Sequence, residues 1–231
     1  MVNFIKSDTP PACLAIEKTK PKSENYRCGD VVDTVADDFK DKCYLCEDKN
    51  IHNINVEHFE AAKGDRNKMF DWKNLFFACS YCNNIKSDNE KTPSVLKLLD
   101  CTDSTIKVLE HLKLCVDVSK LPEKHFIVTP NFEDEATLNT ASLLHKIYNE
   151  KPIKTGLKVR GALNLRKKII ENMNDFDDLI QEYRQNVIPK ERIKNKIIKQ
   201  LQIDSAFTAF KVWLVKDTPD LNQEFSQFLP Q

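Results

Sequence analysis

Apolar side chains recur at helical spacing through most of the second half of the chain. The positions of Leu96, Leu99, Val108, Leu109 and Leu112 predict helix from about residue 92 onwards. The same spacing continues between prolines, so we expect further helices at about 135–149, 156–173, 175–186, 190–201 and 204–216. One short strand is expected to interrupt them, at about 125–128.

The first half has a different pattern. Residues 1–30 are polar and carry three prolines, which predicts an extended arm with little regular structure, followed by a short helix at 31–40. Alternating apolar residues at 51–56 predict an extended segment. The apolar run that begins at Leu75 is expected to lead into a helix near Cys79.

These patterns together predict an α+β protein that is mostly α. We expect an N-terminal arm and short helix over residues 1–40, a cysteine-rich unit over 41–92 and an all-helical C-terminal domain over 93–231. A chain of 231 residues is long enough to bury a sizeable core in such an arrangement.

Composition narrows the class of protein. Apolar residues make up 41% and charged residues 30%, which is typical of a globular chain. No apolar run reaches the roughly 18 residues that a membrane helix needs, and the start lacks a signal-peptide core. We therefore expect a cytoplasmic protein with no membrane partner. Only 4 glycines are present, which argues against a glycine-rich phosphate loop.

Charge is balanced overall but unevenly distributed. The 35 Lys and Arg residues match 35 Asp and Glu residues, whereas a free-standing nucleic-acid binder is usually basic. Residues 41–91 hold 8 basic and 9 acidic side chains, and residues 151–200 hold 13 and 6. The basic clusters in the second segment are open to three interpretations: a solvated helix face, a surface for an acidic partner, or a DNA contact.

Four of the eight cysteines form two Cys-x-x-Cys pairs, which are Cys43 with Cys46 and Cys79 with Cys82. Two intervening residues let one tight turn direct both sulfurs at a single ion, and paired motifs of this kind predict a tetrahedral structural zinc site. A redox dithiol would need only one pair. The other four cysteines have no such spacing, and no function is assigned to them.

Candidate chemistry lies between the two cysteine pairs. Glu57 and His58 end the extended segment, Asn74 precedes the apolar run, and Asn83 follows the last cysteine, with Lys86 three residues further on. Each feature alone is common in structural roles. Their order, His then Asn then Asn, is more specific because two Cys-x-x-Cys pairs frame it.

This arrangement resembles the HNH endonuclease family, whose fold is a ββα-metal unit, and in particular its zinc-bearing subgroup. The resemblance covers about residues 41–91. It implies that His58 is the general base, that Glu57 and Asn83 bind a catalytic cation, and that Asn74 orients the loop beside His58. Lys86 matches a common position of the family and is expected to steady a phosphate. The proline that many relatives carry shortly after the histidine is missing here.

The chemistry of these groups is consistent with such roles. Phosphodiester hydrolysis needs a base for the attacking water and stabilisation of the departing oxygen. Neutral imidazole suits the base, since its ordinary pKa is about 6.5. Carboxylate and amide oxygens suit Mg²⁺ or Mn²⁺, whereas thiolates suit zinc. Two metals with separate roles are therefore expected.

A narrower resemblance is to the PtuB-type nuclease subunits of Septu anti-phage systems, which also occur beside some retrons. It rests on residues 43–47, 57–59, 72–76 and 79–83, and more weakly on 161–165. It implies a DNA substrate and a hetero-oligomer with an ABC-class ATPase of the PtuA type, which restrains the nuclease and helps it reach DNA.

Two other functions stay open at this point. One is a stand-alone, restriction-type HNH nuclease, for which the sequence shows no base-reading module. The other is a zinc-dependent interaction module without catalysis, such as a zinc ribbon or treble clef, which would need neither His58 nor Asn74.

Overall fold

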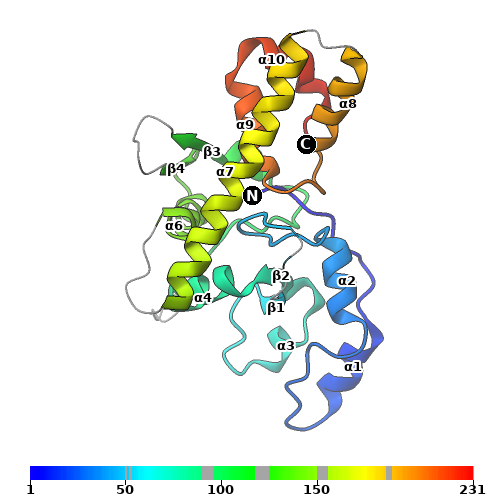
Figure 1. The fold of residues 1–231 in the computed structure, drawn as a ribbon. Coiled ribbons are helices and arrows are strands. Elements are labelled where there is room, and N and C mark those ends of the chain that lie inside the picture. Colours follow the sequence, from blue (N-terminus) through cyan, green and yellow to red (C-terminus); the bar gives the residue numbers. More distant parts are fainter. Residues whose placement is uncertain are drawn as a thin grey trace.

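The chain folds around two small antiparallel strand pairs, each covered by helices, in the computed structural model (Figure 1). The structure describes residues 1–49, 51, 54–89, 96–117, 125–149, 156–185 and 189–230. Both the predicted domain boundary near residue 92 and the prolines at 122 and 152 lie outside these ranges.

The elements of the first half are short and surround the first strand pair. In chain order they are α1 (Ala12–Thr19), α2 (Val31–Asp38), β1 (Ile54–His58), α3 (Arg66–Met69), a 3₁₀ turn (Trp72–Asn74), β2 (Leu75–Cys79) and α4 (Ser80–Asn89).

The second half is dominated by longer helices. Its elements are α5 (Val108–His111), β3 (Leu112–Asp117), β4 (His125–Pro130), α6 (Glu135–Asn149), α7 (Gly156–Arg184), α8 (Lys190–Gln200), α9 (Thr208–Asp217), α10 (Pro219–Phe225) and a closing 3₁₀ turn (Ser226–Phe228).

β2 lies at the centre of the first half, and all five of its residues are buried. Phe76 is in ring contact with Phe39, which follows α2, with Tyr44 and with Phe59, at centroid distances of 5.2, 5.1 and 4.6 Å. Burial of aromatic side chains dominates core energetics in proteins of this size. This cluster therefore fixes α2 and both sides of β1 against β2.

The prediction of an extended N-terminal arm is wrong in part. Residues 12–19 form helix α1, and Cys13 is joined by a disulfide to Cys28, cysteines to which the sequence assigned no function. The extended residues before α1 pack into the core, where Met1, Val2 and Phe4 are buried. Several of these first residues are apolar, although the segment 1–30 as a whole is mostly polar. The prediction followed the composition of the whole segment.

The prediction of an all-helical C-terminal domain is also wrong. Leu112, Leu114 and Val116 lie on β3, which pairs with β4 in an antiparallel register that sets Leu112 opposite Pro130. Alternate residues of a strand point to the same face, and here Leu112 and Leu114 are buried. The apolar residues across 96–112 have helical spacing, but α5 is the only helix that the structure forms there. The predicted strand at 125–128 is confirmed and extends to residue 130.

The remaining helices agree closely with their predicted positions. α6 matches residues 135–149, and Asp134 caps it by accepting a hydrogen bond of 3.0 Å from the Thr137 amide. The two helices expected at 156–173 and 175–186 form the single helix α7, since nothing at residue 174 breaks it. Phe207 and Phe210, expected in the core, are buried.

Candidate metal centre and nuclease site

The two Cys-x-x-Cys pairs come from different kinds of local structure. Cys43 and Cys46 lie on a turn between α2 and β1, which the Glu47 amide closes by donating 2.9 Å to the Cys43 carbonyl. Glu47 adopts a left-handed backbone with φ 60° to make this turn. Cys79 ends β2, and Cys82 lies in the first turn of α4. The strand-to-helix junction thus directs the second pair of sulfurs towards the first.

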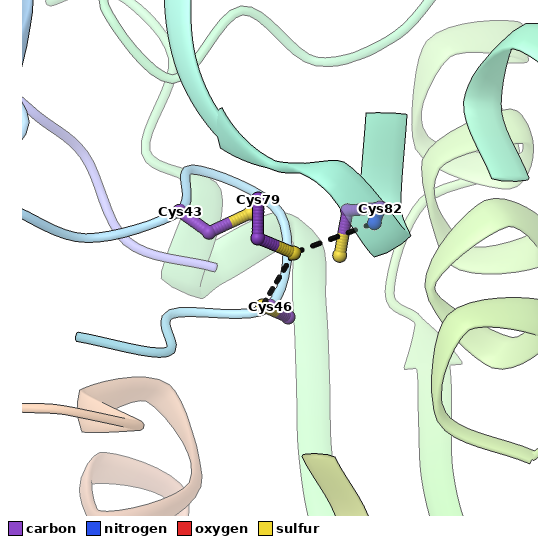
Figure 2. A group of neighbouring side chains, drawn as sticks. All are labelled: Cys43, Cys46, Cys79 and Cys82. Carbon is purple, nitrogen blue, oxygen red and sulfur yellow. Dashed lines mark hydrogen bonds between the residues drawn. The ribbon is translucent and has the colours of Figure 1, made fainter. Parts of the chain in front are cut away.

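All four sulfurs lie within 4.8 Å of one another, and all four residues are buried (Figure 2). The sulfurs of Cys46 and Cys79 are 3.9 Å apart. Zinc bound by four thiolates at about 2.3 Å places neighbouring sulfurs about 3.8 Å apart in a regular tetrahedron. The cluster therefore has the dimensions and the ligand type of a zinc site.

The electrostatics of the cluster also fit a cation. Hydrogen bonds from Cys43, Cys46 and Cys82 lower the pKa of the Cys79 thiol, whereas burial raises the pKa of Cys46 and Cys82. Several thiolates together in a buried space need a positive charge between them. Zinc supplies that charge, so these residues fit the ion that their spacing predicted.

β1, β2 and α4 follow one another in a ββα order that is attached to this cluster. β1 pairs with β2 in a register that sets Ile54 opposite Cys79 and His58 opposite Leu75. The cysteines consequently lie at one end of the strand pair, and His58 and Asn74 lie at the other.

His58 is half-buried between two other segments. Its Nε2 lies 3.0 Å from the Met69 carbonyl oxygen, and the Tyr26 ring packs 4.4 Å from its own ring. A carbonyl oxygen only accepts hydrogen bonds, so Nε2 carries the proton in the neutral ring. Any further proton that His58 takes up must go to Nδ1.

Asn74 binds the loop that follows His58. Its Oδ1 accepts 2.7 Å from the Glu60 amide, while its Nδ2 donates 2.9 Å to the Glu60 carbonyl and 3.0 Å to the Lys68 carbonyl. The Asn74 carbonyl also accepts 2.8 Å from the Phe59 amide. One buried amide therefore fixes both ends of the loop between the two strands.

Glu57 points to the opposite side of β1 from His58, as neighbours on a strand do. It is 5% exposed, and its carboxylate lies 3.3 Å from the Lys86 ammonium. Burial raises the pKa of Glu57, and the attraction of Lys86 opposes that rise. A carboxylate that is buried and already paired does not fit the role of an open ligand for a hydrated Mg²⁺.

Lys86 is also occupied. Besides Glu57, its ammonium donates 2.7 Å to the His58 carbonyl and 2.8 Å to the Phe59 carbonyl, and its side chain is 1% exposed. The sequence expected Lys86 to steady a phosphate. The structure instead places its ammonium in the interior, where it ties α4 to the end of β1.

Asn83 directly follows Cys82 on α4 and is half-buried. Within the described ranges its side chain makes no hydrogen bond, so its amide oxygen is not engaged in the way that Glu57 is.

Sequence reasoning missed the neighbours of His58 in the N-terminal segment. Tyr26 comes from the loop between α1 and α2, and Arg66 on α3 holds this region by donating to carbonyls of residues 17, 18, 20 and 23. No spacing in the sequence connects residues that lie about forty positions apart, so no signal could have identified them.

A cavity beside the 3₁₀ turn is lined by residues other than His58, Asn74 and the four cysteines. Its volume is about 650 Å³, and its lining includes Lys6, Trp72 and four aspartates, Asp8, Asp71, Asp100 and Asp103. Those aspartates at 71, 100 and 103 accept hydrogen bonds from their own loops. The cavity therefore does not contribute to the candidate site.

No protein-family model matches the chain, and no curated protein matches it. None of the helices in the described ranges is long and apolar enough to cross a membrane.

Proposed function

We propose that this chain is an HNH-type endonuclease that hydrolyses DNA phosphodiester bonds, with His58 as the general base. The observation that carries the proposal is the set of three hydrogen bonds from the Asn74 side chain to the loop after His58. A loop fixed in this way holds the histidine backbone in one position, which a general base requires.

The residues support a simple proton transfer. Met69 holds the proton on Nε2, so Nδ1 is the nitrogen that accepts a proton from water. The water oxygen then attacks phosphorus, the bond from phosphorus to the 3′ oxygen breaks, and the 3′ oxygen takes a proton from solvent water. The products carry 5′-phosphate and 3′-hydroxyl ends, as the resemblance to the family implies.

The four cysteines hold zinc in this proposal, and zinc has a structural role. A site with four thiolate ligands leaves no open position for water or substrate. Its effect is to fix the Cys43–Cys46 turn against the junction of β2 and α4, at the end of the unit away from His58.

A catalytic Mg²⁺ or Mn²⁺ belongs to the reaction class, but the arrangement of Glu57 does not support its binding there. Lys86 already neutralises Glu57, and the pair is buried. We assign no step to a cation, and the dependence on added Mg²⁺ or Mn²⁺ is an outcome of the experiment below.

The biological context of the proposal comes from the resemblance to Septu nuclease subunits. It is a phage-defence complex in which an ABC-class ATPase controls the nuclease, in some cases beside a retron. The zero net charge of the chain supports a need for such a partner, since a neutral protein binds DNA weakly by itself.

The test is plasmid cleavage by the purified chain, with and without added Mg²⁺ or Mn²⁺, compared with His58→Ala. His145→Ala is the matched control, because His145 is exposed on α6 and outside the site. Cutting by the wild type and the control, with loss in His58→Ala, supports the proposal. If neither protein cuts, the assay is repeated with the neighbouring ATPase.

A folded, zinc-loaded His58→Ala protein that cuts as fast as the wild type would remove His58 from the mechanism. Failure of every protein to cut, with the ATPase present, would favour the second candidate, a non-catalytic zinc-dependent interaction module. The observation that favours that candidate is the closed Glu57–Lys86 pair.

A further inference from the structure

Helix α8 carries three of its basic side chains on one face and its two buried isoleucines on another. Ile193 and Ile197 are buried against the rest of the protein. Arg192, Lys196 and Lys199 are all exposed. At about 100° per residue, these three cations fall within an arc of about 60° on the side away from the isoleucines. We call Arg192, Lys196 and Lys199 the α8 stripe.

Acidic side chains do not occupy the arc of the stripe, since Glu191, the one acidic residue of α8, is exposed about 80° from its edge. Glu224 on α10 lies 2.5 Å from Lys194, and Asp220 lies 2.9 Å from Arg184. Among the described residues, none forms an ion pair or hydrogen bond with the three side chains of the stripe. In a chain whose net charge is zero, this is a local excess of three positive charges on one surface.

The dimensions of the stripe fit a line of phosphates. Seven residues separate its ends, which is about 10 Å along a helix. Duplex DNA carries a charge about every 3.4 Å along each strand, so three cations over this length can each meet a phosphate. The side chains are long, flexible and exposed, as backbone contacts without sequence preference require.

We propose that the α8 stripe binds the phosphate backbone of duplex DNA. The stripe lies on the helix beside the C-terminal end of α7, at the end of the molecule away from the β1–β2 pair (Figure 1). It therefore forms a second contact, separate from the candidate nuclease site. The choice of DNA as partner rests on the proposed function. The exposure and charge of the α8 stripe are observed independently of that function.

The experiment measures binding of a fluorescent DNA duplex to the full chain by anisotropy, without added Mg²⁺ or Mn²⁺, at several salt concentrations. The test variant is Arg192→Gln/Lys196→Gln/Lys199→Gln. The control is Lys40→Gln/Lys97→Gln/Lys107→Gln, which removes the same charge from other exposed positions. Thermal melts verify that both variants fold.

We expect the stripe variant to lose about tenfold or more in affinity at moderate salt. Its plot of log K against log salt should be less steep by about 2.7, since each phosphate contact contributes about 0.9. The control should keep the affinity and slope of the wild type.

Three results would overturn the inference: equal losses in both variants, no loss in the stripe variant, or no binding by the wild type even at low salt. Equal losses would mean that net charge alone governs binding. The proposed nuclease function fails separately. Stripe-dependent binding without cleavage, even with the ATPase present, would contradict the enzyme only. His58-dependent cleavage without a stripe effect on binding would contradict the stripe only.

Discussion

The ammonium of Lys86 lies 2.7 Å from the carbonyl oxygen of His58, and this bond joins α4 to the last residue of β1. The same ammonium lies 3.3 Å from the Glu57 carboxylate and neutralises its charge. Lys86 therefore acts on the position of His58 through the backbone. A phosphate outside the protein is out of reach of a side chain that is 1% exposed.

Lys86→Met should reduce the free energy of unfolding by about 3 to 5 kcal/mol, because it leaves the buried Glu57 carboxylate without its partner. Urea denaturation measures this. The double variant Glu57→Gln/Lys86→Met should recover part of the loss, since no charge is then buried alone. Lys68→Met is the control: Lys68 pairs with Glu60 at the surface, and its loss should have a much smaller effect. An equal effect of both single variants would contradict the role of Lys86.

Asn74→Ala should destabilise the protein by about 3 kcal/mol, at about 1 kcal/mol for each of the three hydrogen bonds lost. The effect should be local as well. Hydrogen exchange should accelerate in residues 60–68 more than in β2. Asn84→Ala, at an exposed position of α4, should change neither quantity. Unchanged exchange in the loop of Asn74→Ala would show that the amide does not hold it.

Cys79→Ser should release the metal and unfold the unit around it. The purified wild type should contain about one zinc per chain by mass spectrometry of the metal, since the cluster offers four thiolates for one tetrahedral ion. Cys115→Ser is the control because Cys115 is half-buried on β3 and outside the cluster. A Cys79→Ser protein with unchanged zinc content and melting temperature would mean that the cluster is not a structural zinc site.

The free energy of unfolding should depend on pH through the titration of Lys211. Burial lowers the pKa of Lys211 to about 7, from 10.5 in the unfolded chain. Between these values the unfolded state binds more protons, so stability rises with pH from about 7 to about 10.5. Lys211→Met cannot titrate there. The difference in unfolding free energy between wild type and variant should therefore shift in favour of the wild type across this range, and a constant difference would contradict the lowered pKa.

Several features of the fold could be predicted from local pattern. α6 and α8 begin and end close to the expected residues, because Pro189 and the Asp134 cap act locally, whereas α9 begins four residues later than expected. β3 could not be predicted in this way. Leu112 continues the helical spacing of the residues before it, whereas Leu112, Leu114 and Val116 alternate, and the pairing with β4 follows the alternation.

By itself, the sequence determined the four-cysteine cluster. Two residues between each pair of thiols limit their geometry so strongly that the spacing alone predicted a common site, and the four sulfurs do lie together. It also placed His58 at the end of an extended segment, which is confirmed as β1.

Only the tertiary structure decided what surrounds those residues. Tyr26 against His58, Lys86 beneath Glu57 and the Cys13–Cys28 disulfide all join segments that the sequence does not connect. The physical reason is that burial and pairing depend on three-dimensional neighbours. A lysine three residues beyond an asparagine looks the same in sequence whether its ammonium faces solvent or, as here, two backbone carbonyls and a carboxylate in the interior.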